Sequence, residues 1–172
     1  PAVSSGSGIL LMLERRRLSA PGPAFYCDNN VHRLGRSLRM LGYDTLLFGD
    51  GKDDELPRLR DESGRILLTR DSDFENESNT LILASDIYLE QLKIVVTTFK
   101  LDVETYRYSI CLECNTVIHS TDPSAHAKDV PDWVVAEGHP LWQCPECRKL
   151  YWAGSHLERM NERFNELFRS GP

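Results

Sequence analysis

Four of the five cysteines in this 172-residue chain form two Cys-x-x-Cys pairs, Cys111/Cys114 and Cys144/Cys147. Two such pairs can surround one structural zinc ion, with zinc–sulfur bonds of roughly 2.3 Å and no position open to substrate. The interval between the pairs is longer than usual, which predicts a loop extending from a zinc ribbon. Two disulfides or a redox-active pair are the alternatives. Disulfides suit a secreted chain, and a redox pair does not explain the second pair, so the spacing favours zinc.

Acidic residues stand just after short apolar runs in the first half of the chain. They are Asp28 and Asp71, with Asp73 two residues further on, and Asp53 and Asp54 lie near the start of the helix predicted after the second run. If the runs are parallel strands, their carboxyl ends share the sheet edge where ligands bind. Carboxylates there could hold magnesium, which can activate water against a phosphodiester. Aspartate is also a preferred helix N-cap, and the sequence leaves both interpretations open.

A basic face is predicted on the segment that follows Asp28. Arg33, Arg36 and Arg39 recur every three residues, opposite an apolar stripe, and Arg70 flanks the acidic positions. Guanidinium groups suit phosphate oxygens. The alternative is a solvated helix face with charge pairs, although no acid lies four residues from these arginines. The net charge of −6 argues against coating nucleic acid by bulk electrostatics, but it allows a local basic face.

The elements that must position these residues alternate along the chain. Apolar runs at 24–27, 45–48, 65–69 and 80–84 predict strands, and the segments 31–41, 53–60 and 87–99 predict helices. This alternation predicts an α/β fold with a parallel sheet flanked by helices. We expect a linker or extension at 1–23, an α/β core at 24–107, a zinc ribbon at 108–154 and, at 155–172, a helix packing on the core. The tryptophans Trp133, Trp142 and Trp152 are interpreted as packing around the ribbon, although an exposed one could stack a base.

The setting of the chain is predicted from its ends and its cysteines. No apolar run approaches the ~20 residues that cross a bilayer, and the first eight residues resemble neither a signal peptide nor a transit peptide. The start lacks Met and is rich in Ser and Gly, as a linker would be, which predicts a piece of a larger protein. An unpaired Cys27 beside four zinc ligands fits an intracellular setting, cytoplasmic or nuclear/perinuclear. The patch at 9–17 could pack on a protein partner.

Several blocks of the sequence, in order from about residue 24 to 160, resemble the Mut-seven-type C-terminal RNase family. They include Phe25-Tyr26-Cys27-Asp28, Leu67-Leu68-Thr69-Arg70-Asp71, both cysteine pairs, and Tyr151-Trp152-Ala153-Gly154-Ser155-His156. The resemblance implies a PIN-like α/β fold fused to a zinc ribbon, with RNA as substrate or ligand. In PIN-like nucleases, strand-end acids bind magnesium or manganese and hydrolyse RNA. Carried over by motif, these acids are Asp28, Asp54, Asp71 and Asp73.

Domains of this kind form the C-terminal part of larger 3′–5′ exoribonucleases associated with small-RNA silencing. The resemblance therefore implies an RNA-binding domain that holds single-stranded RNA for the exonuclease domain of the same parent chain, using Arg33, Arg36, Arg39 and Arg70. An alternative is a metal-dependent ribonuclease built on the aspartates. A third is a protein-docking module. The acidic segment 72–77 would repel an RNA phosphate, which favours binding over turnover.

Overall fold

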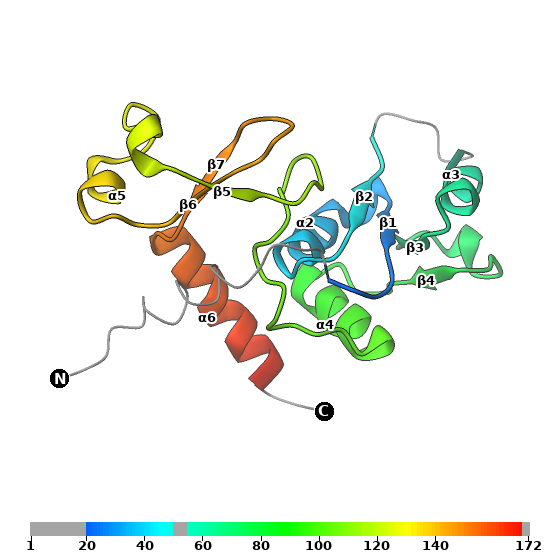
Figure 1. Ribbon diagram of the computed structural model, residues 1–172. Coiled ribbons are helices and arrows are strands. Elements are labelled where there is room, and N and C mark those ends of the chain that lie inside the picture. The colour runs from blue at the N-terminus through cyan, green and yellow to red at the C-terminus, as the bar shows by residue number, and fades with distance from the viewer. Residues whose placement is uncertain (1–19, 50–54, 170–172) are drawn as a thin grey trace.

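The computed structural model describes residues 20–49 and 55–169 (Figure 1). Its larger sheet has four parallel strands in the order β2-β1-β3-β4. The strands are β1 (Phe25–Cys27), β2 (Thr45–Leu47), β3 (Ile66–Thr69) and β4 (Thr80–Ile82). The predicted α/β class with a parallel sheet is therefore confirmed. Asp53, Asp54 and the 9–17 patch lie outside the described residues.

Helices cover both faces of this sheet because successive strand side chains alternate in direction. Phe25 and Cys27 of β1 face a cluster built with helices α2 (His32–Met40), α4 (Tyr88–Phe99) and α6 (Ser155–Arg169). Tyr26 points the other way and packs with Leu56 of α3 (Leu56–Ser63). The approach of α2 to the sheet requires Gly35, since an added Cβ would lie 3.0 Å from the Cys27 Sγ. The flanking helices that the alternation predicts are thus present.

Helix α3 differs from its predicted span of 53–60. It begins at Leu56 and ends at Ser63, with Pro57 in its first turn and Gly64 in the left-handed conformation (φ 64°) just beyond it. Proline is tolerated in the first turn, where its missing N–H has no partner to lose. Glycine accepts a positive φ without a Cβ clash, and this ends the helix.

The second sheet belongs to the ribbon and has three antiparallel strands in the order β5-β6-β7. They are β5 (His119–Thr121), β6 (Leu141–Gln143) and β7 (Leu150–Trp152). The long interval between the cysteine pairs contains β5, helix α5 (Asp132–Ala136) and the short 3-10 helix η4 (Pro123–His126). Two further 3-10 helices, η1 (Asn29–Val31) and η3 (Ser72–Phe74), follow β1 and β3.

Helix α6 begins beside the ribbon and packs alongside α4 (Figure 1). Its Phe164 is fully buried in the cluster formed with α2 and α4. The buried guanidinium of Arg107 donates hydrogen bonds to the side-chain oxygens of Asn161 and Asn165 on α6. Within the described residues, no helix is long and apolar enough to cross a membrane.

Candidate functional site

The four paired cysteines converge at the tip of the ribbon. Their Sγ atoms all lie within 4.8 Å of one another, and those of Cys111 and Cys147 are 3.7 Å apart. A tetrahedron with zinc–sulfur bonds of ~2.3 Å has edges of about 3.8 Å, so this spacing fits a zinc ion. All five cysteines lie in the described residues, and each is a free thiol.

The two cysteine pairs have the same backbone geometry. Each loop closes with a 3.0 Å hydrogen bond, from the Asn115 N–H to the Cys111 carbonyl and from the Arg148 N–H to the Cys144 carbonyl. Asn115 and Arg148 both take the left-handed conformation, with φ of 60° and 62°. The repeated turn directs both thiols of each pair toward one point, as a tetrahedral site requires.

The thiols titrate differently because they crowd one another. Although burial alone would raise it, hydrogen bonds from the Tyr151 hydroxyl and backbone N–H groups lower the pKa of Cys111 to about 7. The hydrogen bond with Cys147, burial and the charge of Cys111 raise the pKa of Cys114 to about 12. A cation among the four sulfur atoms would stabilise all of them as thiolates, and this donor set is the one zinc prefers. The cysteine cluster could hold one zinc ion.

Arg39 joins the ribbon to the large sheet. It is only 4% exposed, and its Nη1 donates to the carbonyls of Leu112 and Glu113 at 2.7 and 2.9 Å. Its Nε donates to the Thr45 carbonyl at 2.8 Å. Arg39 was grouped with the predicted phosphate-binding arginines, but this guanidinium is buried and occupied by carbonyls. Helical spacing placed it on the basic face, and the docked ribbon covers that part of the face.

Asn115 and Asp44 complete this junction. The side-chain oxygen of Asn115 accepts a 2.9 Å hydrogen bond from the Thr45 N–H, and its amide donates to Asp44. Asp44 also pairs with Arg65 at 2.7 Å. Partial burial would raise the pKa of Asp44, but the hydrogen bonds from Arg65 and Asn115 outweigh it and leave that pKa below its ordinary value. The junction therefore rests on the residues between and just after the first two cysteines.

The other predicted arginines are more accessible. Arg36 forms two hydrogen bonds with the Glu113 carboxylate, at 2.9 and 3.0 Å, and Lys149 of the ribbon contacts the same carboxylate at 2.8 Å. These contacts lower the pKa of Glu113 to about 2, the Arg36 hydrogen bond contributing most. Arg33 is exposed and lies 4.4 Å from the centre of the Tyr88 ring. Arg70 is also exposed, just after β3.

The acidic edge of the large sheet centres on Asp28, which is 5% exposed. Its Oδ2 accepts hydrogen bonds from the Thr69 hydroxyl and the Asn30 amide, both at 2.6 Å, and its Oδ1 accepts one from the Asn29 N–H at 2.6 Å. The Thr69 hydroxyl in turn accepts from the Asp71 N–H at 3.0 Å. Asp28 and Asp71 thus share one hydrogen-bond network, as their strand-end positions predict.

The aspartates also serve as N-caps, the alternative that the sequence left open. Asp28 caps η1, and Asp71 caps η3 by accepting from the Asp73 N–H at 2.9 Å. In the described part of the chain, the cysteines form the single cluster of three or more potential metal ligands. Asp54 lies outside that part. A magnesium or manganese ion at this edge, and the catalytic roles of Asp28, Asp54, Asp71 and Asp73, stay predictions.

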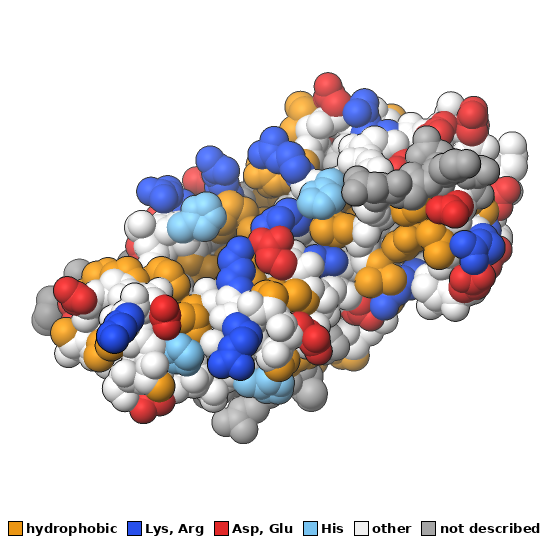
Figure 2. All heavy atoms as spheres, turned by 90° about the horizontal axis from the view of Figure 1, so that it is seen from above, with side chains coloured by type: hydrophobic (Ala, Val, Ile, Leu, Met, Phe, Trp, Pro, Cys, Tyr) orange, Lys and Arg blue, Asp and Glu red, His pale blue; other side chains and the backbone are white. Residues whose placement is uncertain are grey.

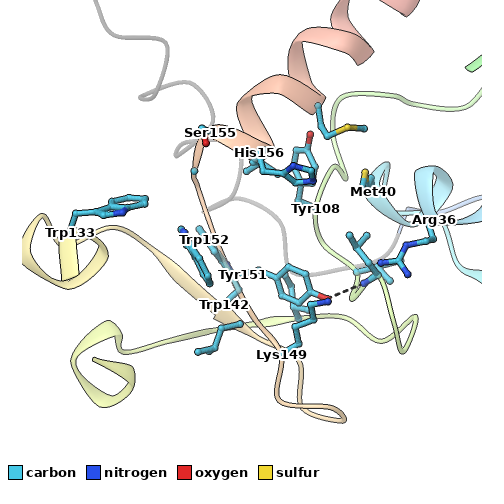
Figure 3. A pocket seen from close by; sticks show the side chains of 17 residues that line it. Arg36, Met40, Tyr108, Trp133, Trp142, Lys149, Tyr151, Trp152, Ser155 and His156 are labelled. Atoms are coloured by element: carbon cyan, nitrogen blue, oxygen red, sulfur yellow. Dashed lines mark hydrogen bonds between the residues drawn. The ribbon is translucent and has the colours of Figure 1, made fainter. Parts of the chain in front are cut away.

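A cavity of about 500 Å³ opens between α2, the ribbon and the start of α6. Figure 3 shows Trp152 and Tyr151 along β7, with Trp133 of α5 on one side and Met40 and Arg36 of α2 on the other. The Tyr151 hydroxyl accepts a 3.2 Å hydrogen bond from the Leu112 N–H, which orients this ring. The sequence analysis predicts that the tryptophans pack around the ribbon. The structure shows that they also line a pocket, because α2 lies on the opposite side of the same cavity.

The fold and the site define an α/β domain with a four-cysteine ribbon docked on its edge. The family described as Mut7-C RNAse domain matches residues 23–164. The chain belongs to this family, which confirms the resemblance drawn from the sequence blocks. No curated protein and no solved structure matches the chain. Membership in the family supports a nuclease-like or RNA-related role.

Proposed function

We propose that this chain is an RNA-binding domain that holds single-stranded RNA for the 3′–5′ exoribonuclease domain of a larger parent protein acting in small-RNA silencing. The family match over residues 23–164 supports the RNA-related part of this proposal. The link to an exonuclease and to silencing rests on the resemblance described above. The observation that carries the proposal is a continuous basic band shared by α2 and the ribbon.

The basic band consists of Arg33, Arg36 and Lys149. Arg33 and Arg36 are one turn apart on α2, and Lys149 reaches the carboxylate that Arg36 contacts. Figure 2 shows Lys and Arg side chains gathered across the middle of one face, interleaved with hydrophobic side chains. Exposed cations beside apolar surface suit a single strand, which offers both phosphates and base faces. Because the net charge of the chain is −6, we expect the rest of the surface to repel phosphates and RNA to bind at this basic face.

The acidic edge supports binding over turnover. A catalytic magnesium or manganese ion needs carboxylate oxygens free to coordinate it. The carboxylate of Asp28 is buried and already accepts three hydrogen bonds, and that of Asp71 caps η3. These hydrogen bonds stabilise the turns after β1 and β3 in their present form. The aspartates therefore have a structural use that needs no metal ion.

A charge reversal on the basic band tests the proposal. Arg33→Glu should weaken binding of labelled single-stranded RNA by roughly tenfold and reduce the slope of log affinity against log salt by at least ~0.7, because a phosphate contact is lost. Fluorescence anisotropy across a salt series measures both quantities. Arg58→Glu is the matched control, because Arg58 is also an exposed helical arginine, on α3, and forms an ion pair with Glu62 of its own helix.

The same RNA incubated with manganese tests the ribonuclease alternative. We expect binding without cleavage, both in the wild type and in Asp71→Asn. Cleavage by the wild type that is lost in Asp71→Asn would replace the binding proposal with a catalytic one. Equal losses of RNA affinity in Arg33→Glu and Arg58→Glu would also refute the basic band, since neither position would then matter specifically.

A further inference from the structure

The aromatic cavity adjoins the basic band but has a different chemistry. Three of its walls come from Trp133, Trp152 and Tyr151, and Leu112 and Met40 close the side toward α2. Its volume of about 500 Å³ is within the range of roughly 300–1,000 Å³ that is typical of small-molecule sites. A space of this size and composition can take a planar aromatic group.

Trp133 is the accessible wall of the cavity. It is 38% exposed, whereas Trp142 is 6% exposed and packs among the cysteines. His139 packs against Trp133 in a T-shaped arrangement, with the ring centres 5.0 Å apart and the ring planes at 83°. Trp152 and Trp133 both lie within 4 Å of the position where a Cβ on Gly154 would sit. The absence of a side chain at Gly154 therefore leaves space beside both indole rings.

The charges at the cavity are cationic. Among the described residues, no carboxylate lines it, and its ionisable lining residues are Arg36, Lys149, Tyr108, Tyr151 and His156. The Glu113 carboxylate pairs with both cations of this edge, Arg36 and Lys149. Two cations share one anion there, so this edge keeps a net positive charge. Arginine in particular matches the geometry of a phosphate.

The start of α6 adds a second attraction for anions. Gly154, Ser155 and His156 line the cavity at the N-terminal end of this 15-residue helix. The first N–H groups of a helix lack partners within it and carry partial positive charge. The exposed side chains of Ser155 and His156 offer further hydrogen bonds beside the indole rings. Ring faces, donors and cations are thus combined in one hollow.

We propose that this cavity binds one nucleobase of a single-stranded RNA, stacked against Trp133 and Trp152, while Arg36 and Lys149 contact its neighbouring phosphates. This inference rests on the proposed RNA-binding function and assigns it a second, base-stacking site. An apolar peptide would use the rings but gain nothing from two cations and a helix N-terminus at the edge. A nucleotide uses all three features, because it joins a flat aromatic base to a charged phosphate.

Two oligomers of equal length separate stacking from charge. One is a short labelled oligouridylate, and the other is its abasic counterpart, which keeps the ribose–phosphate chain and lacks bases. Trp133→Ala in the full chain should weaken oligouridylate binding roughly fivefold to hundredfold, the range for losing one stacked base. It should leave abasic binding unchanged. Trp133→Phe should restore most of the affinity, because a ring remains.

Ile94→Ala is the matched control for loss of an exposed apolar side chain. Ile94 is 40% exposed on α4, against 38% for Trp133. Circular dichroism and thermal unfolding check that each variant folds. Glu113→Gln should tighten binding of both oligomers, because it removes the carboxylate that competes with phosphate for Arg36 and Lys149.

The outcomes distinguish this inference from the proposed function. If wild type binds oligouridylate and Trp133→Ala binds it equally well, the base site is wrong and RNA binding by the basic band stands. Equal weakening of both oligomers by Trp133→Ala would also overturn stacking. Glu113→Gln without any gain would remove the phosphate contacts from this edge. If the wild type binds neither oligomer, the proposed function itself fails.

Discussion

The large sheet and the ribbon are stabilised by different means. The sheet buries a continuous apolar cluster in which residues such as Leu34, Leu38 and Leu92 are fully inaccessible. The central cluster of the ribbon contains Cys111, Ile118, Trp142 and Cys144, so half of its buried members belong to the group that could hold a zinc ion. Hydrophobic burial holds the first region together, whereas the ribbon combines a smaller apolar cluster with four thiols that could hold a zinc ion.

The junction between them has a third character. Arg39, Asn115 and Asp44 join the regions through hydrogen bonds to backbone and side-chain groups rather than through apolar contact. The carbonyls that Arg39 contacts belong to Leu112 and Glu113, between the first two cysteines. The turn between the first two candidate zinc ligands is therefore also the docking surface for the sheet. Losing the turn should release the whole ribbon.

Removing a bound metal ion should produce the largest difference in stability between the ribbon and the large sheet. Structural zinc sites contribute roughly 10–16 kcal/mol of apparent binding free energy, which is folding free energy for the elements they join. Chelation, or Cys144→Ser, should abolish amide protection across 108–154 and leave β1 and β3 protected. Hydrogen exchange with mass spectrometry measures both regions in one sample.

Cys27→Ser is the control for that experiment. Cys27 is fully buried in the sheet core, and burial raises the pKa of its thiol, so it is a protonated core residue rather than a ligand. This substitution should reduce protection in the sheet and leave the metal content unchanged. Uniform loss of protection over both regions after chelation would show that they fold as one unit.

Cutting the junction should have an intermediate effect. Arg39→Lys keeps the charge, but a lysine lacks the planar guanidinium that contacts three carbonyls. Hydrogen bonds to charged groups each contribute ~1.5–3 kcal/mol. We therefore expect the free energy of unfolding to fall by about 3 kcal/mol. The ribbon should then unfold separately from the sheet in urea, giving two transitions. Arg36→Lys alters a partly exposed ion pair and should lower the free energy of unfolding by less than about 1 kcal/mol. Similar costs at both positions would contradict the distinction drawn here.

The smallest expected effect is a dependence of the junction on pH. The pKa of Asp44 lies below its ordinary value in the folded chain, so the ionised form stabilises the fold at neutral pH. This contribution is complete above the ordinary pKa of about 3.9 and is lost as the pH falls through the lower folded value. Because the side chain is 40% exposed, screening limits the loss to about 1 kcal/mol. Unfolding experiments from pH 6 to pH 2 (roughly the range of carboxylate titration) measure it.

Asp44→Asn should remove this part of the pH dependence while keeping a side chain of the same shape. Wild type and variant should therefore converge in stability as the pH falls. Parallel stability profiles over the whole range would show that Asp44 contributes nothing through its charge.

Parts of this molecule were predictable because short-range patterns encode them. The strands after residue 24 and the stripes of α2, α4 and α6 follow from spacing, since a buried face repeats with the period of its own element. The cysteine pairs were recognisable because ligand spacing is itself local. The elements inside the interval 115–143 were not predicted individually, since their short strands lack a distinctive period.

Residue types and local spacing alone indicated the four cysteines that could hold zinc, the α/β class and the family. Tertiary structure decided the use of each basic and aromatic residue. Arg33, Arg36 and Arg39 have the same sequence signature, yet the docked ribbon buries Arg39 against Leu112, 73 residues away. The cavity likewise exists only where α2, the ribbon and α6 meet. Side-chain periodicity reports which face of an element is apolar, but exposure of the polar face depends on which distant segment packs there.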